Sequence, residues 1–131
     1  MVDGMDASSS IISVDNDPKL SSIANEYFGT DHRVEIVCDD GSLWLNNRSD
    51  RLFDLIFADA WPGKYSDIEL TLSLLKNGGF YVIDDMKPQP NWPEGHDEKA
   101  TNLMDYLEHR EDLKLVQMDW STGVVIATRN S

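Results

Sequence analysis

Short apolar runs rich in β-branched and aromatic residues alternate along the chain with stretches in which apolar residues recur at helical spacing. Four of these runs predict buried strands, at residues 11–14, 34–37, 53–58 and 80–83. The stretches that follow them predict helices, at about 18–28, 42–46, 66–75 and 96–109. Two further strands are predicted at 113–120 and 124–129, joined by the hairpin signal Ser121-Thr122-Gly123.

Turn and capping residues set the ends of these elements. Asp17 before Pro18 is typical of a helix N-cap, and Gly29 ends that helix. Gly78-Gly79 is expected to break the third helix before the fourth strand. Strands that alternate with helices predict an α/β fold with a mostly parallel sheet, to which the hairpin adds an antiparallel edge.

Length and composition suit a single domain over residues 1–131, with 1–10 as a loose lead-in. Cys38 is the only cysteine, so no internal disulfide is possible, and a reducing, cytoplasmic location is expected. The first ten residues do not resemble a signal peptide, and no run is long enough for a membrane helix.

The net charge is −13. Such a surface repels phosphate backbones, so we expect neither nucleic acid nor a membrane as partner. It suits divalent cations or basic partners, and solubility alone also explains it.

Acidic residues follow four of the predicted strands, at Asp15, at Asp39 and Asp40, at Asp59, and at Asp84 and Asp85. The carboxyl ends of parallel strands form the ligand-binding edge of an open sheet, so these side chains predict a functional rim. Asp15 suits the hydroxyls of a ribose, and Asp40 suits an exocyclic amine such as that of adenine. Asp59 with Asp84 or Asp85 is suited to a hard divalent cation such as magnesium or calcium.

Four motifs resemble class I S-adenosylmethionine-dependent methyltransferases, in the O-methyltransferase branch that includes catechol O-methyltransferase. They are residues 11–18, Cys38-Asp39-Asp40-Gly41, residues 53–60, and the approach Leu74–Gly79 to a strand that ends at Asp84-Asp85. The resemblance implies a Rossmann-like three-layer sandwich that is N-terminally truncated, because the family's first strand and its Gly-x-Gly-x-Gly turn have no match. It also implies that S-adenosylmethionine is bound by residues of the rim, namely Asp15, Asn16, Asp39, Asp40, Gly41 and Asp59.

Two positions depart from the metal-dependent members of this family. The fifth family strand ends there in Asp-Asn, where this chain has Asp84-Asp85, and the family's lysine position holds Pro62, with Lys64 two places later. Tyr65 matches the family's tyrosine. The catalytic candidates are therefore Asp59, Lys64 and His96, although Lys64 also fits a solvated loop and His96 also fits a helix cap.

Trp61 and Trp92 lie in the two loops above the rim, where they suit either stacking on an aromatic acceptor or simple anchoring of the loops. The predicted function is O-methyl transfer to a small-molecule acceptor. The alternatives are a degenerate methyltransferase-like domain with an interaction or regulatory role, and another nucleotide-binding enzyme, which the absence of a phosphate-cradling loop disfavours. A missing central strand would leave backbone groups unpaired, so a homodimer is expected to cover the gap.

Overall fold

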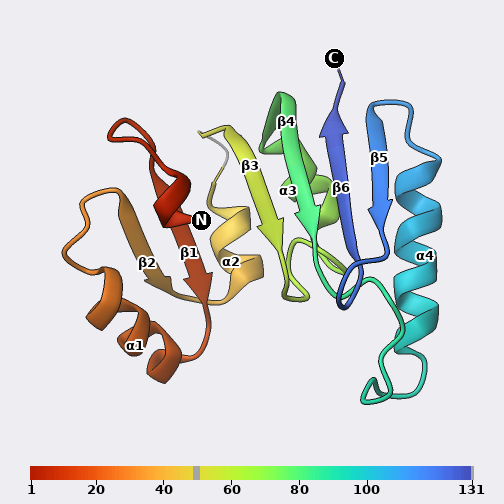
Figure 1. The fold of residues 1–131 in the computed structure, drawn as a ribbon, viewed down its shortest axis with the longest axis horizontal. Coiled ribbons are helices and arrows are strands. Elements are labelled where there is room, and N and C mark those ends of the chain that lie inside the picture. The colour runs from red at the N-terminus through yellow and green to blue at the C-terminus, as the bar shows by residue number, and fades with distance from the viewer. Residues whose placement is uncertain (49–50, 131) are drawn as a thin grey trace. The chain divides into compact units, whose positions relative to one another are not determined.

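The computed structural model describes residues 1–48 and 51–130 (Figure 1). The chain divides into two compact units, Met1–Asn47 and Arg48–Ser131, and the single domain predicted over residues 1–131 stays a prediction. No helix within the described residues has the length and apolar character needed to cross a membrane.

The first unit is a parallel pair of strands with two helices. Its elements are the 3-10 helix η1 (Val2–Gly4), β1 (Ile11–Asp15), α1 (Pro18–Phe28), β2 (Val34–Cys38) and α2 (Gly41–Asn46). β1 and β2 run in the same direction, with Asp15 opposite Cys38. The Asp17 side chain accepts hydrogen bonds from the backbone N–H groups of Lys19 and Leu20, so the predicted N-cap is confirmed.

Specific contacts hold the first ten residues. Arg33 at the start of β2 donates from Nη1 to the Met5 carbonyl at 2.8 Å, and its other nitrogens bind Asp31. The Asp6 carboxylate accepts hydrogen bonds from the backbone and hydroxyl groups of Ser8 and Ser9. The segment predicted as a loose lead-in is therefore tied to β2.

The second unit is a four-stranded mixed sheet with two helices. Its elements are β3 (Phe53–Ala58), α3 (Ile68–Ser73), β4 (Leu75–Ile83), α4 (His96–Glu108), β5 (Leu113–Met118) and β6 (Val124–Arg129). The strand order is β3-β4-β6-β5. β3 and β4 are parallel, and β6 is antiparallel to both β4 and β5, so the predicted C-terminal hairpin is confirmed.

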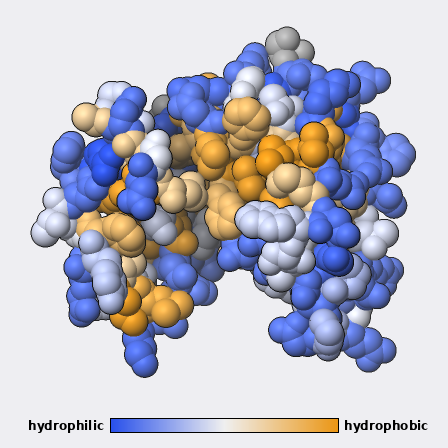
Figure 2. Space-filling model, viewed as in Figure 1, coloured by the Kyte–Doolittle hydropathy of each residue, from blue (hydrophilic) through white to orange (hydrophobic). Residues whose placement is uncertain are grey.

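Both helices of this unit pack on one face of the sheet. The core cluster joins Leu72 of α3 and Leu107 of α4 to Tyr81, Ile83 and other inward-facing strand residues, among them Val125 and Ala127. Since alternate residues of a strand point to opposite faces, the next residues along each strand form the other face. On that face Leu55, Phe57, Phe80 and Val116 are exposed, at 44%, 47%, 48% and 60% respectively. Figure 2 shows apolar side chains gathered over the strands on the face turned to the viewer.

Two predicted boundaries are wrong. The helix expected over 66–75 is shorter, Ile68–Ser73, and the glycine pair expected to separate it from the next strand lies inside β4. Gly79 fits there because a side chain would clash: a Cβ would lie 2.9 Å from the Leu75 side chain and 3.1 Å from the Asp54 carbonyl. The pairing of β3 with β4 shifts register between Phe53 and Leu55, beside this glycine pair.

The predicted parallel pairing is confirmed within both units, where β1 pairs with β2 and β3 pairs with β4 in parallel. The described residues form one two-stranded and one four-stranded sheet.

The β5–β6 turn fixes the chain that leaves β4. The carbonyls of Thr122 and Gly123 accept hydrogen bonds from the backbone N–H groups of Lys87 and Met86, at 2.9 and 3.0 Å. Gly123 has a φ of +86°, and a Cβ placed on it would lie 2.7 Å from the Lys87 backbone nitrogen. Glycine is therefore needed at this position both for its backbone conformation and for space.

We expect Gly123→Ala to lower the free energy of unfolding more than Gly78→Ala does. Both glycines have positive φ, which costs an alanine about 1–2 kcal/mol, but a Cβ at Gly78 meets nothing within 4 Å. The clash with Lys87 should add at least ~1 kcal/mol for Gly123→Ala. Urea unfolding of the two variants measures the difference. Equal losses would show that the turn moves away from Lys87 without cost.

Candidate active site

In the first unit, three carboxylates lie at the carboxyl ends of the parallel strands. Asp15 ends β1, and Asp39 and Asp40 follow β2, with the Asp39 backbone N–H donating to the Asp15 carbonyl at 3.1 Å. All three side chains are exposed. The sequence-predicted residues of this unit, which also include Asn16 and Gly41, therefore lie on the two turns at one edge of its sheet.

Each of these carboxylates also shapes its own turn. Asp15 Oδ1 accepts a hydrogen bond from the Asp17 backbone at 2.7 Å. Asp40 is the N-cap of α2, where its Oδ1 accepts from the Leu43 backbone at 3.0 Å. The Oδ2 atoms of both residues make no hydrogen bond to any residue in 1–48 or 51–130, so each carboxylate keeps one oxygen for a ligand.

In the second unit, Asp59 and Asp84 follow neighbouring parallel strands. Ala58 is opposite Ile83 in the register, and the Asp84 backbone N–H faces the Ala58 carbonyl at 3.4 Å. Asp85 follows with a φ of 53°, in the left-handed region that side chains rarely adopt. The structure therefore brings together the carboxylates at this edge of the sheet, as the sequence predicts.

Lys64 is the buried cation of this edge. It is only 2% exposed, and its ammonium donates to the Asp84 carbonyl at 2.5 Å and faces the Asp85 carbonyl at 3.5 Å. The solvated loop position that the sequence left open for this lysine is therefore wrong. The ammonium holds the two backbone carbonyls that follow β4.

Burial and charge act on the protonation of this group of residues. Burial lowers the pKa of Lys64, and the negative charges of the three aspartates oppose this shift. Partial burial raises the pKa of Asp59, and the neighbouring charges of Asp85 and Asp84 act in the same direction. The edge thus combines a lysine that releases its proton more readily with an aspartate that holds its proton more strongly.

The cation site predicted at Asp59 with Asp84 or Asp85 stays a prediction. No group of three or more His, Cys, Asp or Glu side chains within residues 1–48 and 51–130 is placed to hold a metal ion. Asp84 Oδ1 instead accepts hydrogen bonds from Thr122 Oγ1 at 3.1 Å and from the Asp85 backbone at 2.8 Å. The positive charge of Lys64 acts on the nearby carboxylates of Asp59, Asp84 and Asp85.

An aromatic cluster of Trp61, Tyr65, Trp92 and His96 lies beside this edge. The His96 ring centroid is 4.4 Å from that of Trp92 and 5.2 Å from that of Tyr65, and both contacts are edge-to-face. Trp61 contacts Tyr65 at 5.5 Å. His96 Nε2 and the Tyr65 hydroxyl are 3.4 Å apart, so His96 faces the cluster, and Gly95 is the N-cap residue of α4.

The loop that carries Trp61 and Lys64 is anchored to the core by Tyr81, which the sequence analysis did not single out. Tyr81 is fully buried, and its hydroxyl donates to the Gly63 carbonyl. The Trp61 carbonyl accepts from the backbone of Lys64, Tyr65 and Ser66, which closes the loop on itself. A tyrosine on the inward face of a predicted strand is the only sequence signal for this anchor, because a buried hydroxyl needs a partner.

A family model described as O-methyltransferase matches residues 1–127. The chain belongs to the O-methyltransferase family. No protein with a curated functional description matches the sequence significantly.

Solved structures support the fold of this O-methyltransferase family member. A protein of Corynebacterium glutamicum is 14% identical with a TM-score of 0.84, over 99% of this chain and 65% of the other. A proposed O-methyltransferase of Klebsiella pneumoniae is 18% identical, with a TM-score of 0.85. The match covers 100% of this chain and 66% of the other. An O-methyltransferase of Bacillus cereus, in complex with S-adenosylhomocysteine, is 17% identical, with a TM-score of 0.76. The match covers 97% of this chain and 66% of the other.

These comparisons confirm the Rossmann-like methyltransferase fold. This chain spans about two thirds of the length of the similar structures, 65% of the first of them.

We expect Tyr81→Phe to destabilise this O-methyltransferase family member by about 1–3 kcal/mol, because the buried Gly63 carbonyl loses its donor. Tyr27→Phe is the control, since Tyr27 is 77% exposed and its hydroxyl is solvated. That change should stay within ~0.5 kcal/mol of the parent. Denaturant unfolding compares them, and equal stabilities would mean that Tyr81 does not anchor the loop.

Proposed function

We propose that the chain serves S-adenosylmethionine-dependent methyl transfer to an oxygen atom of a small-molecule acceptor. The observation that carries this proposal is the placement of carboxylates at the strand ends of both units, in a chain of the O-methyltransferase family. The similar Bacillus cereus enzyme, crystallised with S-adenosylhomocysteine, supports the choice of cofactor.

The first unit binds the nucleoside part of the cofactor in this proposal. Asp15 accepts hydrogen bonds from the ribose hydroxyls through the oxygen that its own turn leaves free. Asp40 does the same for the adenine amine, and Asn16, Asp39 and Gly41 line the same turns. Exposed carboxylates with one oxygen already fixed by the backbone are well oriented for such contacts.

The second unit orients the acceptor and handles its proton. S-adenosylmethionine supplies the electrophilic methyl group when bound. Asp59 helps to orient the acceptor, and the positive charge of Lys64 at the same edge stabilises the negative charge that develops on the acceptor oxygen. His96, within the aromatic cluster, receives the proton.

We also propose that the protein is cytoplasmic and works as a homodimer. Cys38 is the only cysteine and is free, which suits a reducing compartment. Leu55, Phe57, Phe80 and Val116 leave an apolar sheet face in contact with water, which a second copy of the chain would bury.

The nucleoside site is tested with Asp15→Asn. This change keeps an oxygen for the turn contact with Asp17 and removes the charge, so the fold should survive. We expect the affinity for S-adenosylhomocysteine to fall by about tenfold or more, since hydrogen bonds to charged groups contribute about 1.5–3 kcal/mol. Asp17→Asn is the matched control: Asp17 caps α1 with its carboxylate, and its loss of charge should leave affinity unchanged.

Isothermal titration calorimetry on the full chain measures these affinities. Equal affinities of Asp15→Asn and the parent would remove Asp15 from the site. If the parent itself shows no binding, the alternative of an interaction domain that has lost its cofactor is favoured instead.

The homodimer is tested by light scattering coupled to size exclusion at micromolar concentration. We expect a dimer for the parent and a monomer for Phe57→Asp, since a charge on the apolar sheet face opposes its burial. Tyr27→Asp, on an exposed side chain of α1, should remain dimeric. A parent that stays monomeric across a dilution series would contradict the proposal.

A further inference from the structure

A pocket of about 280 Å³ is lined by the loop before α3, by the start of α3 and by helix α4. The loop contributes Trp61, Lys64 and Tyr65, α3 contributes Ile68, and α4 contributes Lys99, Asn102, Leu103 and Tyr106. The helical residues recur at steps of three, one and three, so they lie on one flank of α4. This pocket includes neither Asp59 nor the aspartates that follow β4, but Lys64 is common to both sites.

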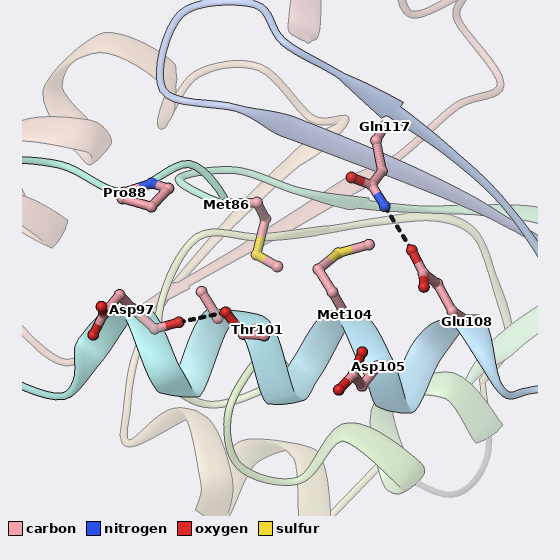
Figure 3. A pocket seen from close by; sticks show the side chains of 9 residues that line it. Met86, Pro88, Asp97, Thr101, Met104, Asp105, Glu108 and Gln117 are labelled. Atoms are coloured by element: carbon pink, nitrogen blue, oxygen red, sulfur yellow. Dashed lines mark hydrogen bonds between the residues drawn. The ribbon is translucent and has the colours of Figure 1, made fainter.

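The charge of this pocket is opposite to that of the whole chain. The chain has 24 acidic and 11 basic residues, yet the pocket is lined by two lysines and by no carboxylate. Another flank of α4 has the opposite charge. Figure 3 shows a smaller pocket there with Asp97, Asp105 and Glu108, and its lining has no lysine or arginine. A single helix thus separates a cationic pocket from an acidic one.

Lys99 provides the accessible positive charge. Its side chain is exposed, and its ammonium lies 5.0 Å from the centre of the Trp61 ring. It makes no ion pair with any residue in 1–48 or 51–130. Lys64 differs, because its side chain is only 2% exposed and its ammonium is already bound to the Asp84 carbonyl. In a chain this acidic, an unpaired lysine in a pocket is suited to an anionic ligand.

The remaining lining residues favour a flat, apolar ligand body. The lining includes two aliphatic side chains, Ile68 and Leu103, and three aromatic rings, those of Trp61, Tyr65 and Tyr106. The Tyr106 hydroxyl accepts a hydrogen bond from Arg110 at 2.6 Å, which fixes that ring. Aromatic rings pack best against planar groups in stacked or edge-to-face contacts.

We propose that this pocket binds a small aromatic carboxylate, with the carboxylate at Lys99 and the ring among Trp61, Tyr65 and Tyr106. Binding at the pocket does not depend on the methyl-transfer proposal. Lys64 lines the pocket and also donates to the Asp84 carbonyl, so the pocket adjoins the acidic edge of the sheet. A ligand with a ring hydroxyl therefore belongs either to the acceptor class or to a class of regulators bound beside the acceptor.

The test uses the full chain and 4-hydroxybenzoate as the probe. Its amide, 4-hydroxybenzamide, has the same shape without the charge, and tyramine carries the opposite charge. We expect the carboxylate to bind about tenfold more tightly than the amide, with tyramine weaker still, and the preference to shrink at high salt. In NMR spectra the indole N–H signal of Trp61 should shift, while that of Trp120, which is 71% exposed and outside the pocket, should not.

Lys99→Gln, compared with Lys114→Gln, tests whether binding depends on the charge in the pocket or on the net charge of the chain. It should remove the preference for the carboxylate and leave binding of the amide unchanged, because the aromatic walls stay in place. Lys114→Gln removes the same charge from an exposed site on β5 and should have no effect. Equal effects of the two substitutions, equal affinity for carboxylate and amide, or no saturable binding at millimolar probe would overturn the proposal.

Addition of S-adenosylmethionine distinguishes the two sources of ligand. Methylation of the probe's hydroxyl, detected by mass spectrometry, would identify the pocket as the acceptor site. Binding that depends on Lys99 without methylation would identify a separate ligand site and would leave the pocket proposal intact even if methyl transfer fails.

Discussion

The ammonium of Lys64 is the contact on which the acidic edge of the second unit depends. Three aspartates at adjoining strand ends repel one another, and a cation among them reduces that repulsion. The ammonium is almost fully buried, so it loses most of its hydration and needs the carbonyl of Asp84 as compensation. Loop closure at Trp61 and the hydroxyl of Tyr81 hold the lysine stem in position for this contact.

Several aspartates of this chain serve the backbone and keep an oxygen for another partner. Asp15 closes its turn, Asp40 caps α2, and Asp84 binds the backbone of Asp85. In each case one carboxylate oxygen is fixed by an N–H group close in sequence. Such side chains have lost most of their rotational freedom before any ligand arrives, so binding costs less entropy. The same residues therefore stabilise the turns and orient the candidate site.

Local sequence signals predicted most elements correctly. Asp17 with Pro18 predicts the start of α1, and the apolar run 53–58 predicts β3 with its bounds. The start of β4 could not be predicted in this way, because its glycine pair is typical of a helix stop, whereas Gly79 is needed inside the strand, where a Cβ would clash with Leu75, Lys76 and Asp54. The position of the aspartates at the strand ends could be predicted from the topology alone. The burial of Lys64 could not be predicted, because it depends on Tyr81 and on carbonyls about twenty residues away in the chain.

The apolar face of the four-stranded sheet has a consequence for handling the protein. β3 is an edge strand, and edge strands beside apolar surface are where sheets of different molecules join. The net charge of −13 keeps molecules apart at neutral pH. That repulsion disappears as the pH approaches the isoelectric point of about 4.3. Acidification therefore weakens the repulsion that keeps the apolar sheet faces of separate molecules apart.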